Sequence, residues 1–188
     1  MSLLAVQGGA TGSGTVTLLA PVTNTNQTLT LPDATGTVLS TATAGVPVNG
    51  PAFSVSSSAT VSVAASTFTK ITFDTEDFDT NSNFASSRFT PTVAGYYQLN
   101  TTLIFYQNTA TGIGLVTFYK NGARFLDGQS IVLSATAAQY LNNAGIIYFN
   151  GSTDYVEVYA LQTTVSAMNI GSDTSTRKFT GAMIRSAV

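Results

Sequence analysis

The sequence predicts an all-β protein, a two-sheet antiparallel jelly roll that follows an N-terminal β-rich extended arm. No stretch keeps the period of a helix, and short runs of aromatic and β-branched residues alternate with polar ones instead. Gly, Asn, Asp and Pro separate these runs, which is the pattern of sandwiches and barrels. Roughly eight to ten such runs in one domain suit two sheets whose edges are closed or covered.

The chain divides where several helix- and strand-breaking residues fall close together, in Gly45–Pro51. Glycine and proline at this density mark a loop between structured segments. We therefore predict an arm over residues 1–50 and a head over residues 51–188. The arm is expected to anchor the protein and to exchange strands with neighbours.

The predicted arm contains two imperfect copies of one alternating pattern, Gly14–Leu19 and Gln27–Pro32. Such short strands cannot bury both faces alone, so we expect them to pack on a neighbour or to pair with another chain. A disordered tail is the alternative, and the apolar content of the arm favours order. The candidate anchoring residues are Leu18, Leu19, Leu29, Leu31, Val38 and Leu39.

Turn residues then set the order of strands in the head. Pro91 breaks the run before it, and Gly95 is expected to allow a turn that a side chain would resist. Asn121-Gly122 between two β-rich runs is the strongest short signal for a hairpin. The predicted strands are Ala52–Val55, Thr67–Phe73, Tyr96–Tyr106, Leu115–Lys120, Ala123–Leu126, Ile131–Leu133, Gln139–Leu141, Gly145–Phe149, Tyr155–Leu161 and Arg177–Ile184.

The run Tyr155–Leu161 is apolar on both faces of the predicted strand. Alternation places Val156, Val158 and Ala160 on one face. The other face is rich in tyrosine, which offers a large contact area with a polar end, so this face is a candidate contact with another subunit. A strand buried between the sheets and covering loops is the alternative reading. The candidate interface residues are Tyr155, Glu157, Tyr159 and Leu161, together with Tyr97 of the central strand.

Charge is scarce in this chain of 188 residues, of which 44% are hydrophobic and 9% are charged. Polar uncharged residues must then cover the surface, which suits a subunit buried against neighbours; a lone sandwich with a polar uncharged coat is the alternative. A formal charge of −2 without a basic patch argues against nucleic acid as a partner. No apolar run approaches the ~20 residues of a membrane span, and we expect neither a membrane partner nor a signal peptide.

Residues for catalysis are mostly missing from the sequence. The absence of His and Cys excludes Ser-His triads, Cys nucleophiles and the common zinc sets, so we expect no enzyme and no cofactor. One carboxylate cluster could form a glycosidase pair or an irregular calcium loop, but crowding in one loop favours a solvated acidic turn. These weak calcium candidates are Asp74, Glu76, Asp77 and Asp79.

Several motifs of the predicted head resemble those of one known family. The run Arg88–Leu99, the hairpin Lys120–Gly122 and the closing run Phe179–Ile184 resemble the globular head of complement C-one-q and the wider tumour-necrosis-factor-like jelly roll. The resemblance covers residues 51–188, with Ala182 in place of a closing aromatic residue. It implies a homotrimeric binding or structural module, and it favours the threefold axis as the place for the tyrosine-rich face of Tyr155–Leu161.

The arm carries a second, shorter resemblance. Gln27–Ser40 is similar to segments of tailed-bacteriophage fibre and decoration proteins. This implies a trimeric decoration or cement protein on the capsid surface of a virion, anchored by its arm to the major capsid protein or other virion subunits. The alternative is a receptor-binding tail-fibre tip or adhesin whose exposed loops recognise a host glycan or protein.

Overall fold

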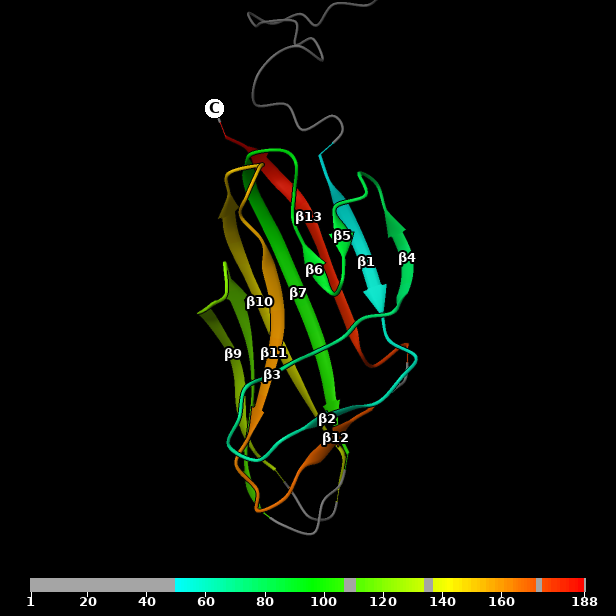
Figure 1. Ribbon diagram of the computed structural model, residues 1–188, viewed down its shortest axis with the longest axis vertical. Helices are drawn as coiled ribbons and strands as arrows, with labels where there is room; N and C mark the ends of the chain where they lie inside the picture. The colour runs from blue at the N-terminus through cyan, green and yellow to red at the C-terminus, as the bar shows by residue number, and fades with distance from the viewer. Residues whose placement is uncertain (1–49, 107–110, 134–136, 172–173, 188) are drawn as a thin grey trace, which may run out of the picture. The chain divides into compact units, whose positions relative to one another are not determined.

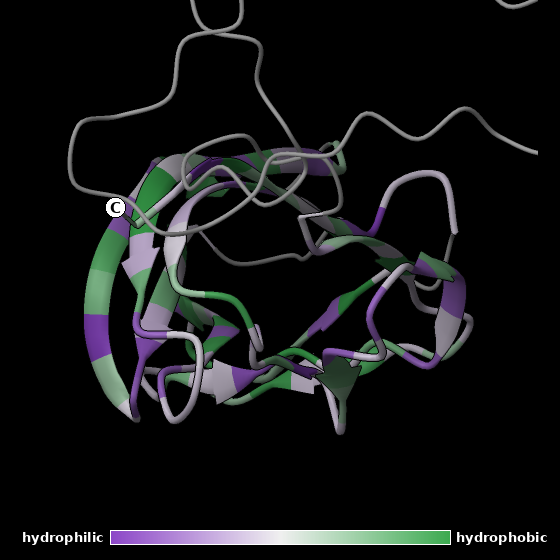
Figure 2. Ribbon diagram, turned by 90° about the horizontal axis from the view of Figure 1, so that it is seen from above, coloured by the Kyte–Doolittle hydropathy of each residue, from purple (hydrophilic) through white to green (hydrophobic). Residues whose placement is uncertain are grey.

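The computed structural model describes residues 50–106, 111–133, 137–171 and 174–187, which contain thirteen strands and no helix (Figure 1). The strands form two sheets, and every pairing between named strands is antiparallel. Seen from above, the sheets are two layers that face each other (Figure 2). The predicted arm lies outside the described residues up to residue 49, and so do all its candidate anchors: Leu18, Leu19, Leu29, Leu31, Val38 and Leu39.

Two long strands dominate the first sheet. β7 and β10 are each 11 residues long and pair over their whole length, from Gly95 opposite Phe149 to Phe105 opposite Gln139. β13 pairs with the other edge of β7, and β1 and β4 follow outward. The strands of this sheet are β1 (Ala52–Ser56), β2 (Val61–Val63), β4 (Thr75–Asp79), β7 (Gly95–Phe105), β10 (Gln139–Phe149), β12 (Met168–Ile170) and β13 (Lys178–Ser186).

The second sheet is built around the predicted Asn-Gly hairpin, which the structure confirms. Asn121 and Gly122 have φ of 53° and 80° and join β8 to β9. Positive φ at both positions is the requirement of the tight turns that connect twisted strands. The strands of this sheet are β3 (Thr69–Lys70), β5 (Phe84–Ala85), β6 (Arg88–Phe89), β8 (Gly112–Lys120), β9 (Ala123–Leu133) and β11 (Val156–Gln162).

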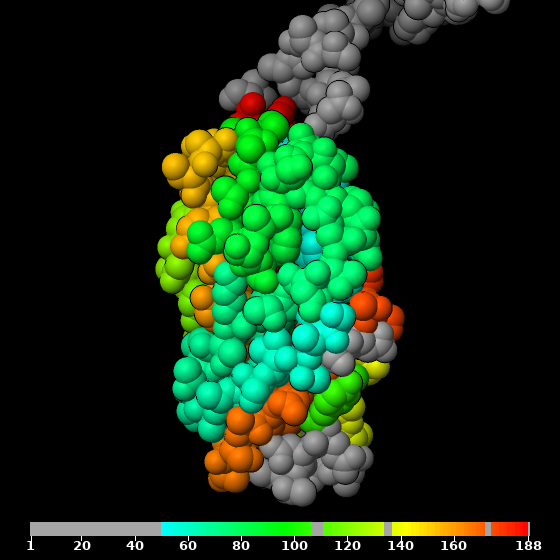
Figure 3. Space-filling model, turned by 45° about the vertical axis from the view of Figure 1, so that its right-hand side comes forward, coloured from blue at the N-terminus to red at the C-terminus, as the bar shows by residue number. Residues whose placement is uncertain are grey.

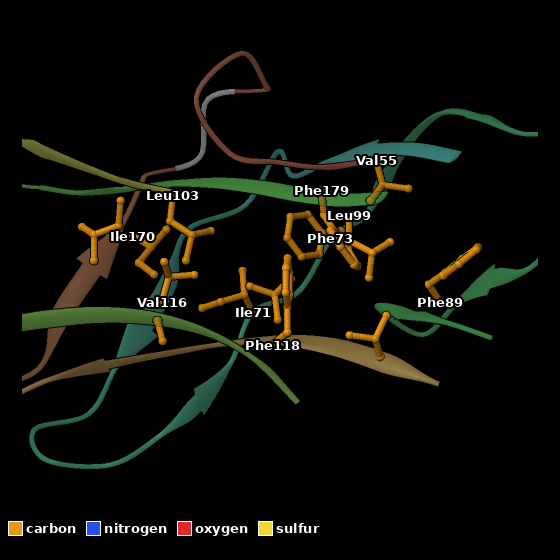
Figure 4. Close-up of a cluster of buried hydrophobic side chains, with 14 of the residues drawn as sticks. Val55, Ile71, Phe73, Phe89, Leu99, Leu103, Val116, Phe118, Ile170 and Phe179 are labelled. Carbon is orange, nitrogen blue, oxygen red and sulfur yellow. The ribbon is translucent and has the colours of Figure 1, made fainter. Parts of the chain in front are cut away.

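The core fills the space between the two sheets (Figure 4). Alternation along β7 turns Leu99 and Leu103 inward, and both are fully buried. Phe53 of β1 stacks on Phe89 with ring centroids 4.3 Å apart, and it meets the edge of Phe179 at 4.9 Å. Because these rings come from both sheets, they join the layers at one end of the sandwich.

Gly95 has a different role from the predicted one. It is the first residue of β7, and positive φ among the described glycines occurs at Gly122 and Gly151 but not here. A Cβ atom on Gly95 would lie 2.4 Å from the carbonyl oxygen of Arg185. Glycine is therefore required by the close approach of β13 rather than by a turn.

Two predicted irregular stretches turn out to be strands. The acidic run expected to be a turn forms β4, because it pairs with β1 along the edge of the first sheet. The separate strands predicted on either side of Asn142–Ala144 are one continuous β10. Polar residues continue this strand because they find partners beside it: Thr102 Oγ1 donates to Asn142 Oδ1 at 2.8 Å, and Asn143 Nδ2 donates to the Leu126 carbonyl at 2.9 Å.

Replacement of Phe53 by alanine tests the core that joins the sheets. We expect Phe53→Ala to lower the free energy of unfolding by about 3–5 kcal/mol, because it removes a buried ring and leaves a cavity. Urea denaturation at a fixed protein concentration measures this loss. Val165→Ala is the matched control, since Val165 is 90% exposed, and a similar effect of both variants would contradict the assigned core.

Candidate functional site

The outer face of the first sheet gathers exposed aromatic and apolar side chains. Because strand residues alternate between faces, the burial of Leu99 in the core leaves Tyr96 and Gln98 pointing outward. The antiparallel register places Tyr148 of β10 opposite Tyr96, and Ile146 opposite Gln98. The rings of Tyr96 and Tyr148 have centroids 5.4 Å apart. One end of this sheet therefore presents a continuous apolar surface to solvent.

A hollow of about 620 Å³ lies at this end of the face. Tyr96, Ile146, Tyr148 and Ile184 are between 43% and 58% exposed, which is high for large apolar side chains. The end of β13 forms the remaining wall and contributes one positive charge. The residues that line the hollow are Tyr96, Ile146, Tyr148, Ile184, Arg185, Ser186 and Ala187.

The middle of the same face carries no charge on its two long strands. Neither β7 nor β10 contains a charged residue. A smaller hollow of about 230 Å³ lies there, and small or amide side chains from Ala52, Ala182, Gln98 and Asn100 line part of it, beside Phe78 of β4. An apolar, charge-poor centre of this kind is the composition of the core of a protein–protein interface.

Lys120 supports the aromatic end of this face from behind. Its Nζ donates to the backbone carbonyl of Tyr148 at 2.8 Å and lies 3.0 Å from a carboxylate oxygen of Asp154. The hydrogen bond from Asn121 and the contact with Lys120 hold the pKa of Asp154 below its ordinary value. The hairpin of the second sheet thus fixes the end of β10 that carries Tyr148.

The tyrosine-rich face predicted for Tyr155–Leu161 lies on the outside of the second sheet. Glu157 is buried, and Lys70 Nζ and Arg88 Nη2 lie 2.7 and 2.9 Å from its Oε1 atom. Arg88 also covers the ring of Tyr155, at 3.7 Å from its centroid. The chain between β2 and β7 wraps over this side of the molecule (Figure 3).

Side chains of the same molecule also cover the rest of that predicted face. Tyr159 stacks on Tyr119 of β8 with centroids 4.0 Å apart, and Leu161 pairs with Leu115 in the ladder and is half-buried. Tyr97 lies apart from both, fully buried in the core, where its hydroxyl donates to the Val93 carbonyl at 2.7 Å. A role of these five residues between subunits stays a prediction, and a single chain already accounts for their burial.

The four weak calcium candidates each have separate surroundings. Asp74 accepts hydrogen bonds from the backbone and hydroxyl of Ser58, and Asp79 accepts one from the backbone of Phe84. Asp77 pairs with Lys178, whose hydrogen bond lowers the pKa of this carboxyl group. Glu76 is exposed on β4. Within the described ranges, no three His, Cys, Asp or Glu side chains come together in a way that could hold a metal ion.

Sequence reasoning placed the candidate interface on β11 and missed the residues of β10 and β13. The signal was present, because continuous alternation through Gln139–Phe149 would have put Ile146 and Tyr148 on the face opposite the core. Reading Asn142 and Asn143 as a turn interrupted that pattern. The described part of the chain also contains no helix that is long and apolar enough to cross a membrane.

Comparisons with known structures support the fold. Murine APRIL superposes with a TM-score of 0.54 at 14% identity, covering 72% of this chain and 100% of that chain. The globular domain of zebrafish complement 1qA gives 0.52 at 16% identity, with 74% and 100% covered. Eiger TNF from S. frugiperda gives 0.53 at 10% identity, with 74% and 95% covered. No protein-family model and no curated protein sequence matches this chain.

The buried carboxylate of Glu157 generates a prediction on stability and pH. Burial alone would raise the pKa of Glu157, but hydrogen bonds from Lys70 and Arg88 outweigh it and hold the pKa below the ordinary value of 4.5. A lowered folded-state pKa contributes stability above the ordinary value, and this contribution is lost as the pH falls through the lowered value.

We therefore expect Glu157→Gln to cost about 1–2 kcal/mol at pH 7, in the lower part of the range because its partners are partly exposed. The difference from the parent protein should shrink below pH 4.5. Denaturant titrations at pH 7 and pH 3 measure both effects. A difference that stays constant between these pH values would contradict the assigned ion pairs.

Proposed function

We propose that the protein is a homotrimeric, non-enzymatic structural module whose heads associate through the outer face of the first sheet. The observation that carries this proposal is the aromatic and uncharged surface formed by Tyr96, Ile146, Tyr148 and Ile184. Soluble monomers seldom expose contiguous apolar patches of large side chains, and such patches mark interaction sites. The motifs that resemble complement C-one-q heads support three as the number of copies.

The described side chains also support a role without catalysis. The sequence has no His and no Cys, and Glu157, Asp154, Asp127 and Asp77 are each engaged with a cation. A catalytic acid or base must reach its substrate with a suitable pKa, and carboxylates held in ion pairs with lowered pKa values are poorly placed for that.

We further propose that the trimer decorates or cements the capsid of a virion, with the major capsid protein or other virion subunits as its partners. The similarity of Gln27–Ser40 to tailed-bacteriophage segments supports this assignment. The low charge of the chain supports it too, because subunits buried against neighbours need few charged groups. The arm supplies the contact with neighbouring subunits.

A receptor-binding fibre tip is the second candidate, and one feature favours it. Ile113, Val132 and Val165 are 48%, 70% and 90% exposed. Ile113 pairs with Val132 where β8 begins and β9 ends, and Val165 lies in the loop between β11 and β12. In Figure 1 these strand ends lie at the end of the head opposite the start of β1. Exposed aliphatic residues at a tip are suited to a partner. Gold-labelled antibody on purified particles separates the candidates: label over the capsid supports decoration, and label at the tail tip supports receptor binding.

A charge placed on the proposed face tests the self-association. Ile146→Asp should weaken the association at least about 100-fold, because it buries an unpaired carboxylate in the contact. Sedimentation equilibrium should then report one chain instead of three, with an unchanged circular dichroism spectrum. Val165→Asp, at the far end of the head, is the control and should remain trimeric. A trimeric Ile146→Asp variant would place the contact on another face.

Deletion of residues 1–45 tests the role of the arm. We expect the shortened chain to remain a folded trimer, because the proposed contact lies entirely in the head, and to lose co-sedimentation with capsid particles. The full-length protein mixed with the same particles is the control. Particle binding retained by the shortened chain would contradict anchoring through the arm.

A further inference from the structure

Arg185 is set apart from the other exposed cations. Lys70 and Arg88 pair with Glu157, and other exposed cations have carboxylates of their own. Among the described residues, the guanidinium group of Arg185 has neither a carboxylate within 4.0 Å nor a hydrogen-bond partner. It nevertheless lies on the wall of the 620 Å³ hollow, next to exposed apolar side chains. An unpaired guanidinium beside an apolar hollow suits a ligand that combines apolar groups with one negative charge.

Self-association through this face would bury the guanidinium group of Arg185, which has no carboxylate partner in the described part of the chain. A second head placed over Ile146 and Tyr148 would remove water from Arg185 as well. Burying a charge without a partner costs several kcal/mol, so an acid beside Arg185 would strengthen the contact between heads. The hollow itself must also be filled, because the centre of an interface is packed as densely as a protein interior.

The described chain begins beside this hollow. The Met183 amide donates to the Pro51 carbonyl at 3.0 Å, and a Cβ on Gly50 would meet the side chain of Met183 at 2.7 Å. Met183 directly precedes Ile184 and Arg185 in β13. The residues that precede Gly50 in the sequence therefore start next to the end of the sheet that carries the hollow.

The sequence before Gly50 contains one segment with the required chemistry. Asp33 is the only charged side chain before Lys70. Leu29 and Leu31 precede it at alternate positions, so an extended segment would turn both leucines to one side. Pro32 between Leu31 and Asp33 favours an extended conformation for the residue before it.

We propose that Leu29–Asp33 of one copy docks in the hollow of a neighbouring copy, with Asp33 paired to Arg185 and Leu31 against Ile184. Gly50 lies beside the hollow of its own head, so a segment that docked in that hollow would need only a few of residues 34–49 as a connection. Residues 34–49, when extended, span roughly 50 Å, enough to reach an adjacent copy. The docking rests on the proposed self-association only in that both use the same face.

Disulfide trapping tests this docking, because the native chain has no cysteine. Leu31→Cys is combined with Ile184→Cys in the full-length protein and oxidised under mild conditions. A disulfide forms only where Cα atoms come within about 7 Å, so the bond reports close approach. Leu18→Cys with Ile184→Cys is the matched control. We expect covalent oligomers on a non-reducing gel, at several times the yield of the control.

The charge pair is tested on the same double-cysteine background. Asp33→Asn and Arg185→Gln should each lower the yield of covalent oligomers roughly three- to tenfold, and the exchange Asp33→Arg with Arg185→Asp should restore it. A yield no higher than the control, a bond formed only within one chain, or a yield insensitive to both charges would overturn the docking. Sedimentation of the reduced samples separates the two proposals. A reduced protein that is trimeric but gives no disulfide on oxidation rejects the docking alone. A reduced protein that is monomeric rejects the self-association.

Discussion

The antiparallel register of β7 and β10 is the constraint on which the rest of the structure depends. It places Leu99 in the core and Tyr96 beside Tyr148 on the outer face. A shift of one residue would exchange the two faces and expose the core. The register is held from both directions: Gly95 allows β13 to approach closely, and Lys120 fixes the end of β10. The paired strands β7 and β10 thus contribute one face to the core and the other face to the candidate interface.

Much of this arrangement could be predicted from the sequence, and the failures share one cause. The central strand, the Asn121-Gly122 hairpin and the closing strand have strong local signals, namely alternation and turn residues. β4 and the middle of β10 have polar sequences that indicate turns when read alone. They become strands because partners distant in the sequence, such as Lys178 for Asp77, satisfy their polar groups. The sequence of a single segment does not reveal partners that lie far away along the chain.

The candidate site shows the same limit in a different form. Both faces of β11 are apolar, which correctly indicates that both are covered, but the sequence does not say by what. The structure shows cover from the same chain, through Lys70, Arg88 and Tyr119. The exposed apolar side chains of the candidate site lie on β7, β10 and β13, where amides and hydroxyls interrupt the apolar pattern. An interface can therefore be recognised only after the intramolecular contacts have been accounted for.

The scarce charges also determine where a partner can bind. Carboxylates along β4 oppose the addition of another strand at that edge of the first sheet. At the opposite edge, Asn143 donates to the Leu126 carbonyl and Gln129 accepts from the Asn142 amide, so side chains of β9 and β10 close the corner between the sheets. Exposed ion pairs add little stability, but they keep the surfaces that carry them in solvent. The first sheet consequently offers a partner its face rather than its edges.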